Sequence, residues 1–453
     1  MPIINLSFNT LALLAATANG LNVLKTTTTP NGFSGPALGW NTFGLQATQL
    51  APGWSTLEQS EVLKQCSIMA SNSKLKAAGY KYCSLDSGWS ADGADSYGRV
   101  IFEPSRFPDF NTSFTKTLHD DGLLLGVYAI RGVVYLDVDK PILGTNLKIA
   151  DALQGQAPNY VDAGNARRVF DFSKDGAQQW HDSVVALWAS CCNTNDPYPT
   201  CNNPDLPLDS SATVEAYRKA IVKSGRSIRL DISWKLDRNA TYYDIWRANA
   251  ESMRTDQDIN EGNGSPIFVK WKTLLSIYPD MDNLYVGNAD EISGVKSDER
   301  TSIMTHWICA GANLMAGSDL TNMDAHGIDT LTNSGAQAVA AFTRRFSMQP
   351  RNPGSGGTEA KQLQAWIAGP SNNGSAVAVL ANYGPDQGRG GFGTSLSGSQ
   401  TVSITIEDLG LEGSFFVHDV WADQDEETVK AGVPLARNLS KGQSKLLLLT
   451  PVS

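Results

Sequence analysis

The chain has 453 residues, of which 41% are hydrophobic and 18% are charged, so it can bury a large core. This length exceeds that of one ordinary domain and suits a barrel of about 250 to 350 residues followed by a smaller module. The formal net charge of -10 excludes nucleic acid and anionic membrane surfaces as expected partners, because both repel an acidic protein, and a neutral ligand fits better.

The N-terminal segment contains a short apolar run, residues 11–18, that ends in an Ala-x-Ala-type cleavage site. It predicts a secretory signal peptide over residues 1–18, although the usual basic residues before the apolar run are missing. No later run approaches the roughly 20 apolar residues of a membrane-spanning helix, so we expect a soluble, extracellular mature protein. Glycosylation sequons at Asn111, Asn239, Asn373 and Asn438 agree with secretion.

Strand-like apolar runs alternate with helical segments through the first three quarters of the chain, which predicts a parallel sheet with crossover helices. The strand-like runs cover residues 37–43, 80–86, 123–129, 227–233, 284–287 and 312–316. Helical periodicity covers residues 56–79, 114–121, 175–190, 214–224 and 243–252, and begins again near residue 335. The order of these segments predicts a (β/α)8 barrel over residues 19–349.

The sequence pattern changes after residue 350, where short segments of alternating apolar and polar residues replace the helical segments. Strands are predicted at residues 376–380, 401–406 and 446–449, with turns rich in Gly, Asn and Asp. We therefore predict an antiparallel β-sandwich over residues 350–453.

The barrel pattern is interrupted after the helix at 175–190, where a fourth strand should follow. Residues 191–204 instead contain three prolines and four asparagines, which can hardly form a central strand. Losing a strand would leave two unpaired edges in the barrel. Our interpretation is that residues 191–204 are a mis-spliced or mispredicted replacement for this strand.

Cysteines in an oxidising compartment favour disulfides, and this chain has six: Cys66, Cys83, Cys191, Cys192, Cys201 and Cys309. A zinc site at 191–201 fits poorly, because the spacing matches no ligand template and no histidine lies nearby. Cys309 lies in an apolar segment and is expected to be a buried thiol. The sequence shows no metal, nucleotide or phosphate motif, so we expect no cofactor.

Several motifs occur in a fixed order along the chain, at residues 38–42, 78–89, 107–123, 279–288, 314–320 and 408–421. This ordered set resembles glycoside hydrolase family 27, the α-galactosidases and α-N-acetylgalactosaminidases. The resemblance implies a (β/α)8 barrel followed by an antiparallel β-sandwich. It also implies a retaining glycosidase whose partner is a carbohydrate.

The resemblance gives roles to individual residues. Asp258 matches the acid/base of the family's Arg-x-x-x-Asp motif, and Asp256 beside it is interpreted as structural. The residues expected to bind substrate are Trp40, Asp86, Ser87, Tyr128, Ser233, Trp234 and Arg254. None of the five histidines is given a catalytic role.

The chain departs from the family pattern at two places. The family's acidic pair reads Asp86-Ser87, which replaces one charged acceptor by a hydroxyl and opens the alternative of another sugar, a β-L-arabinopyranoside or an α-glucan. A retaining mechanism also needs a carboxylate nucleophile, which the family carries on strand four in a Lys-x-Asp motif. No such motif is visible; the nearby carboxylates are Asp196, Asp205 and Asp209, and Asp231 on strand five is a weaker substitute.

The sequence therefore predicts a secreted, retaining glycoside hydrolase of α-galactosidase type, with Asp258 as acid/base and an unknown nucleophile. Because the nucleophile is missing, the chain would be inactive if no other carboxylate replaces it. The alternative from another class is a carbohydrate-binding protein that has lost catalysis. No oligomeric state is predicted.

Overall fold

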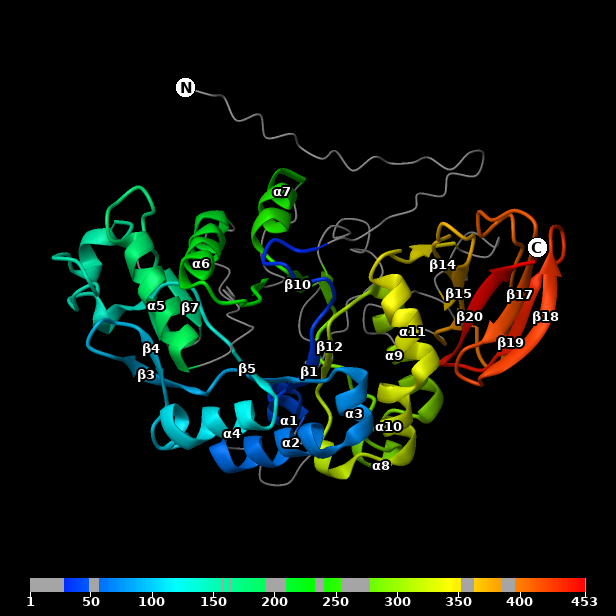
Figure 1. Cartoon of the computed structure of the whole chain (residues 1–453), viewed down its shortest axis with the longest axis horizontal. Helices are drawn as coiled ribbons and strands as arrows, with labels where there is room; N and C mark the ends of the chain where they lie inside the picture. Colours follow the sequence, from blue (N-terminus) through cyan, green and yellow to red (C-terminus); the bar gives the residue numbers. More distant parts are fainter. Residues whose placement is uncertain are drawn as a thin grey trace.

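The protein has an α/β region followed by an all-β region (Figure 1). The structure is a computed structural model. It describes residues 28–48, 57–155, 159–162, 165–191, 209–232, 240–254, 278–351, 362–384 and 396–452. Among these residues, no helix combines the length and the apolar character needed to cross a membrane.

Four parallel strands form the first part of the barrel. β1 (Leu38–Asn41) lies between β12 (Leu314–Ala316) and β2 (Tyr82–Leu85), and β2 pairs with β5 (Leu124–Val127). Each of these strands lies within or overlaps a run that the sequence predicts as strand. The pairing of the first strand with the last is what closes a barrel on one side.

Three further parallel strands form the second part. β10 (Ser252–Arg254) lies between β9 (Asp231–Ile232) and β11 (Tyr278–Asp280). A bridge between Leu284 and Ala316 joins this three-stranded sheet to the four-stranded sheet. In the described part of the chain no strand pairs between β5 and β9, so the barrel is open there. The predicted gap at strand four falls at this opening, and residues 192–208 lie outside the described residues.

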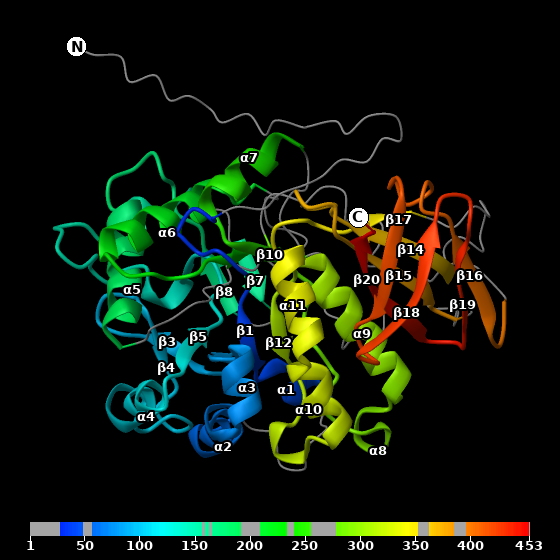
Figure 2. The same cartoon turned by 45° about the vertical axis from the view of Figure 1, so that its right-hand side comes forward.

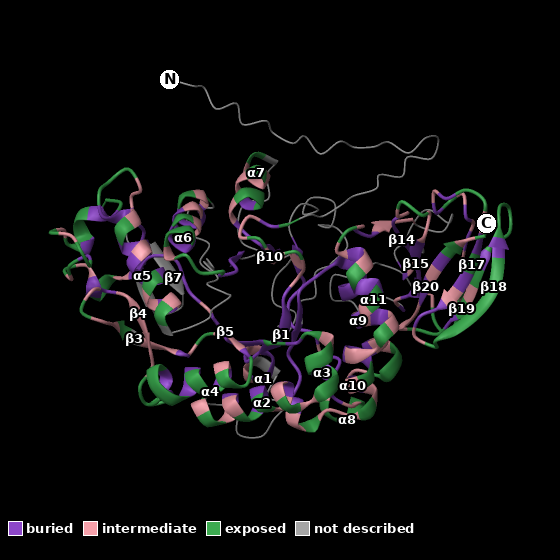
Figure 3. Ribbon diagram, in the orientation of Figure 1, coloured by how far each residue is buried: buried purple, intermediate pink, exposed green. Residues whose placement is uncertain are grey.

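Helices cover the outside of the strands (Figure 3). Their bounds are α1 (Phe43–Thr48), α2 (Gln59–Ser71), α3 (Ser73–Ala78), α4 (Thr115–Asp120), α5 (Ala177–Cys191), α6 (Ser211–Ser224), α7 (Ala240–Asn249), α8 (Asp290–Ser293), α9 (Ser297–Ala310), α10 (Ala325–Thr332) and α11 (Ser334–Thr343). Short helical segments lie at Phe110–Phe114, Tyr135–Asp137, Ile149–Ala152 and Leu320–Asn322. α5 packs directly against α6, so the chain on either side of the opening forms a helical pair.

Local capping explains where some of these helices begin and end. The side chain of Asn72 accepts hydrogen bonds from the backbone N–H groups of Lys74 and Leu75, which starts α3. Gly79, with a φ of 93°, ends α3 in the left-handed conformation that glycine adopts without strain. The predicted helical segment 56–79 is therefore two helices, α2 and α3, separated by Asn72.

Short antiparallel strands decorate the barrel. β3 (Ser90–Ala94) pairs with β4 (Val100–Phe102) after β2. Between β5 and α5, β8 (Asn165–Arg168) lies between β6 (Val133–Val134) and β7 (Asn159–Asp162). These strands are not predicted from the sequence, because they are too short for a clear alternating pattern.

The C-terminal region is the predicted antiparallel module (Figure 2). Its six-stranded sheet has the order β13 (Gln349–Pro350), β14 (Leu363–Ala368), β15 (Ala376–Asn382), β20 (Gln443–Pro451), β17 (Ser414–Asp419) and β18 (Gln424–Lys430). A second sheet pairs β16 (Gln400–Ile404) with β19 (Leu435–Leu439). Apolar residues of both sheets form one core cluster, as in a β-sandwich. The predicted boundary at residue 350 stays a prediction.

Two predictions about cysteines are confirmed in the barrel. Cys66 of α2 forms a disulfide with Cys83 of β2. Cys309 is a buried free thiol, and burial raises its pKa. The structure describes neither the side chain of Cys191 nor the residues Cys192 and Cys201.

Candidate active site

The carboxyl ends of the barrel strands bring several predicted site residues to one end of the barrel. Asp86 follows β2, Tyr128 follows β5, and Arg254 is the last residue of β10. In (β/α)8 barrels this end carries the active site, because parallel strands deliver their following residues to the same rim. We therefore take this rim as the candidate site.

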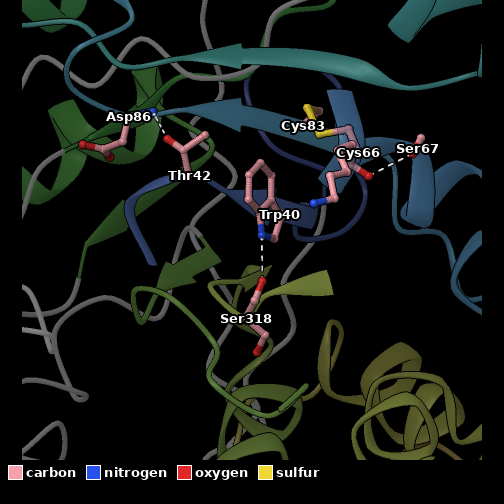
Figure 4. Close-up of a disulfide and its surroundings, with 8 residues drawn as sticks. Trp40, Thr42, Cys66, Ser67, Cys83, Asp86 and Ser318 are labelled. Carbon is pink, nitrogen blue, oxygen red and sulfur yellow. Dashed lines mark hydrogen bonds between the residues drawn. A yellow bond between two sulfur atoms is a disulfide. The ribbon is translucent and has the colours of Figure 1, made fainter. Parts of the chain in front are cut away.

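The loop after β2 is fixed to the end of β1 (Figure 4). The backbone N–H of Asp86 donates to Oγ1 of Thr42 at 2.8 Å. Oδ1 of Asp86 accepts from the N–H of Ser87 at 2.6 Å, and the carbonyl of Ser87 accepts from Nε2 of Gln46 at 2.8 Å. These bonds hold Asp86, which is half-buried, beside the exposed Ser87 at the rim. Such a carboxylate can accept hydrogen bonds from sugar hydroxyls.

Tyr128 is held from the same loop. Nε1 of the buried Trp89 donates to the carbonyl of Tyr128 at 2.7 Å. This bond ties the loop after β2 to the end of β5, so Asp86 and Tyr128 have a common support. Tyr128 is half-buried and packs against Ile130 and Val169.

Trp40 lies in the core behind this rim. It is completely buried, and it stands in register with Cys83, whose sulfur is bonded to Cys66 of α2. Residues in register on parallel strands share a face, so Trp40 points toward the helices. Its Nε1 donates to the carbonyl of Ser318 at 2.9 Å (Figure 4). Its predicted role as a wall of the sugar pocket stays a prediction, for a side chain that the structure places in the core.

The three-stranded sheet carries buried polar groups on its inner face. Nδ2 of Asn313 donates to Oδ2 of Asp231 at 2.9 Å and to Oγ of Ser252 at 3.0 Å. Oδ1 of Asn313 accepts from the N–H of Ala37 at 2.8 Å. Asp231 is therefore bonded into the barrel interior, which suits a structural role better than that of the missing nucleophile.

Arg254 belongs to a compact charged cluster at the rim. Its Nη2 lies 3.1 Å from Oδ2 of Asp282, and both side chains are almost fully enclosed. Oδ1 of Asp280 accepts from the N–H of Asp282 at 2.8 Å. Burial raises the pKa of Asp280; Arg254 opposes this rise and the carboxylate of Asp282 adds to it. Asp282 is not among the residues predicted to form the site, although its position directly after the Pro279-Asp280-Met281 motif is a usable signal.

The remaining predicted site residues are Ser233, Trp234 and Asp258, and they lie outside the described residues, as does Asp256. Their roles stay predictions.

Of the other carboxylates considered for the nucleophile, one lies within the described residues. Asp196 and Asp205 lie outside the described residues. Asp209 lies just before α6, and its Oδ1 accepts from the N–H of Ser211 at 3.0 Å and from its hydroxyl at 2.6 Å. These bonds to Ser211 lower the pKa of Asp209. Asp209 therefore serves the start of a helix, and the nucleophile stays unknown.

A hollow of about 750 Å³ lies away from this rim, on the helical side of the barrel. It is lined by α3, α9, α10 and α11, and by Trp421 from the C-terminal region. Its polar groups include an exposed ion pair, in which Nζ of Lys74 lies 3.3 Å from Oδ1 of Asp329. No described site residue predicted from the sequence lines it, so we do not assign the active site to this hollow.

Comparison with known proteins identifies the family. Residues 38–137 match the family described as alpha galactosidase A, and residues 360–449 match the alpha galactosidase C-terminal beta sandwich domain. Over 95% of its length the chain is 42% identical to alpha-galactosidase 3 of Hypocrea jecorina, and the match covers 73% of that protein. The chain belongs to glycoside hydrolase family 27. It is thus a glycoside hydrolase of α-galactosidase type, as the sequence predicts.

Solved structures similar to this family 27 chain share its fold. A β-L-arabinopyranosidase of family 27 from Geobacillus stearothermophilus superposes with a TM-score of 0.74 at 22% identity, covering 93% of this chain and 98% of the other. The α-galactosidase of Saccharomyces cerevisiae superposes with a TM-score of 0.67 at 16% identity, covering 94% and 100%. The predicted fold class, a (β/α)8 barrel with a C-terminal β-sandwich, is confirmed for this family 27 member.

Proposed function

We propose that this protein hydrolyses terminal α-D-galactosyl residues of galacto-oligosaccharides and polysaccharides. The observation that carries the proposal is the placement of Asp86 and Arg254 at the carboxyl-end rim of the barrel in a family 27 chain. A carboxylate and a guanidinium at this rim provide an acceptor and a donor for the hydroxyl groups of a sugar. Its 42% identical relative is named alpha-galactosidase 3.

The proposed reaction is a double displacement with retention of configuration. A carboxylic acid, Asp258 in our proposal, protonates the glycosidic oxygen while a second carboxylate attacks the anomeric carbon. Asp258, now ionised, then removes a proton from the water that releases the sugar. In a retaining glycosidase the acid/base and the nucleophile lie about 5 to 5.5 Å apart. Proton transfer and covalent catalysis by carboxylates are sufficient for this chemistry.

The test is hydrolysis of nitrophenyl α-D-galactoside by the purified protein. Asp258→Asn should lower kcat by roughly 10²- to 10⁴-fold, because the amide can neither give nor accept the catalytic proton. Asp256→Asn is the matched control and should keep most of the activity. If the wild type binds galactose and releases no nitrophenol, the carbohydrate-binding alternative replaces the proposed hydrolase.

A second sugar is favoured by one observation at the rim. Ser87 stands beside Asp86 where the family has a second carboxylate, and its N–H already donates to Asp86. A neutral hydroxyl binds a sugar hydroxyl less strongly than a carboxylate does, which weakens one expected contact with galactose. A panel of nitrophenyl glycosides decides between α-D-galactoside, β-L-arabinopyranoside and α-glucoside by their kcat/KM values.

We further propose that the protein is secreted and N-glycosylated. The sequon asparagines Asn111, Asn373 and Asn438 are exposed, which supports the proposal, and Asn239 lies outside the described residues. A fall in apparent mass after treatment of the secreted protein with an N-glycosidase would agree with it. An unchanged mass would contradict the glycosylation.

The interpretation of residues 191–204 has its own test. Sequencing the transcript across Ser190 to Asp209 would reveal a lost strand-four exon if one exists. A continuous transcript that encodes the present sequence would overturn the idea of a mis-spliced or mispredicted segment.

A further inference from the structure

Asp282 lies where the chain crosses from one sheet of the barrel to the other. β11 pairs with β10 and ends at Asp280, and Leu284 then bridges to Ala316 of β12. Between these pairings the backbone of Asp282 has a φ of 73°, in the left-handed region that L-residues with a side chain rarely adopt. Backbone of this kind persists only where its surroundings stabilise it, and it concentrates at functional sites.

The other non-glycine residue with a positive φ in the described part of the chain shows what is unusual about Asp282. Asp423, with a φ of 50°, lies in the turn between β17 and β18, and 94% of its side chain is exposed. Asp residues adopt the left-handed conformation in such turns without special support. Asp282 adopts it inside the barrel, where only 6% of its side chain is exposed.

Contacts hold Asp282 along its backbone and its side chain. Its N–H donates to Oδ1 of Asp280 at 2.8 Å, and its carbonyl accepts from Nε1 of Trp307 at 3.4 Å. Oδ1 of its carboxylate accepts from Nδ2 of Asn283 at 3.0 Å. The other oxygen, Oδ2, lies 3.1 Å from Nη2 of Arg254. Asp280 and Trp307 therefore fix the backbone of Asp282, and Asn283 holds the carboxylate, whose second oxygen meets the guanidinium of Arg254.

The aspartate at position 282 shows that this position requires more than a left-handed backbone. If the crossing needed only a left-handed residue, glycine would adopt that φ without strain. The aspartate adds a charged acceptor, and its Oδ2 forms an ion pair with Nη2 of Arg254 at 3.1 Å. A long arginine side chain loses much rotamer freedom when it is held in this way, so a substrate would meet it already oriented.

We propose that Asp282 is a positioning residue, which orients the guanidinium of Arg254 toward the sugar at the rim of the barrel. The inference rests on the proposed function, in which Arg254 contacts the substrate. The left-handed backbone at Asp282, between β11 and Leu284, places the carboxylate beside Arg254. Asp282 itself need not touch the sugar.

The experiment is a double-mutant cycle on the full-length protein with nitrophenyl α-D-galactoside. Asp282→Gly keeps the backbone conformation and removes the carboxylate, and Asp282→Asn keeps the shape and removes the charge. Each should lower kcat/KM by on the order of 10- to 100-fold, because a misplaced binding group loses much of its effect. KM should rise more than kcat falls, since Arg254 would bind the sugar before as well as during the reaction. Asp282→Gly combined with Arg254→Ala should be no worse than Arg254→Ala alone.

Controls separate positioning from a purely structural role. Asp423→Gly, at the exposed turn, should leave kcat and KM as in the wild type. Thermal unfolding of every variant shows whether the barrel is still folded; if Asp282→Gly does not fold, Asp282→Asn decides, because asparagine tolerates a positive φ. A folded Asp282 variant with the wild-type KM, or full additivity with Arg254→Ala, overturns the inference.

The same experiment distinguishes a failure of the proposed function from a failure of the positioning role of Asp282. In that case the wild type itself releases no nitrophenol, and galactose affinity measured by calorimetry replaces KM in the same cycle. Weaker galactose binding by Asp282→Gly, without further weakening in the double variant, still supports the positioning role. A wild type that neither hydrolyses the substrate nor binds galactose overturns both proposals.

Discussion

The two sheets of the barrel present different inner faces. In the four-stranded sheet the outer face packs apolar residues against helices. Its inner face combines small groups at Gly39, Ser84 and Gly126 with the larger side chains of Tyr82 and Met315. A Cβ atom at Gly39 would lie 2.2 Å from the carbonyl oxygen of Tyr82, and one at Gly126 would lie 2.4 Å from Oγ of Ser84. Side chains are excluded there by the close approach of the neighbouring strands.

The three-stranded sheet has the opposite character. Its outer residues Ile232 and Met253 join an apolar cluster, while Asp231, Arg254 and Asp280 alternate with them. Since side chains alternate between the faces of a strand, these charged groups point into the barrel. The difference teaches that the strands of one sheet have an uncharged inner face, whereas the strands of the other carry charged groups into the barrel. A sugar ring at the rim would meet Asp86 from the first sheet and Arg254 from the second.

The largest expected effect on stability is in the four-stranded sheet. Trp40→Ala should lower the free energy of unfolding by about 3 to 5 kcal/mol, because a large side chain with 0% exposure leaves a cavity. Denaturant unfolding measures the loss. Phe416→Ala, at a side chain that is 55% exposed in the sandwich, is the control and should change stability by about 0.5 kcal/mol or less. A small loss for Trp40→Ala would contradict its place in the core.

The disulfide of the same sheet should have the next largest effect. Replacing both Cys66 and Cys83 by alanine should lower the free energy of unfolding by about 3 kcal/mol, because the crosslink spans a sequence separation of 17. The wild type unfolded under reducing conditions is the matched comparison and should resemble the double variant. The kcat and KM of the folded variant should stay near wild type. Equal stability with and without the crosslink would show that it does not brace this sheet.

In the three-stranded sheet we expect a pH dependence of the free energy of unfolding. It arises from the carboxyl group of Glu251, which lies just before β10. Burial raises the pKa of this carboxyl to about 7, although the N–H groups of Leu230 and Asn31 donate to it and oppose the rise. In the unfolded chain the same group ionises near its ordinary value of 4.5. The folded form holds the proton more tightly, so its contribution to stability is complete below about pH 4.5 and is lost as the pH rises to about 7.

Glu251→Gln should remove this dependence, since the amide does not ionise. Relative to this variant, the wild type should lose up to about 3 kcal/mol of stability between pH 4.5 and pH 8. Thermal unfolding of both proteins across this range measures it. The buried His181, whose pKa burial lowers to about 4, destabilises both proteins in acid, so its effect cancels in the comparison. If the stability of the wild type and of Glu251→Gln changed in parallel over this pH range, the pKa of Glu251 would not be raised by burial.

The sequence predicted the order of the strands better than the direction of individual side chains. Alternating strands and helices are enough to infer that Asp86 and Arg254 meet at one rim, because parallel strands end at the same side. Which face Trp40 occupies depends on its register with Cys83, and a motif does not contain that information. Asp282 could not be predicted as a site residue from the sequence. Its proposed role depends on its left-handed backbone conformation and on its ion pair with Arg254, 28 positions earlier. The interruption at strand four was predicted because proline and asparagine are unsuited to a central strand, and residues 192–208 lie outside the described residues.

The bridge between Leu284 and Ala316 has a mechanical consequence. Across the described residues it is where the ladder passes from one sheet to the other, while the far side, between β5 and β9, is open. Asp86 follows a strand of one sheet and Arg254 ends a strand of the other. A sugar bound by both residues would therefore be a second connection between the two sheets, beside the bridge. Occupancy of the site would then brace the barrel itself, and the empty protein would be the looser of the two states.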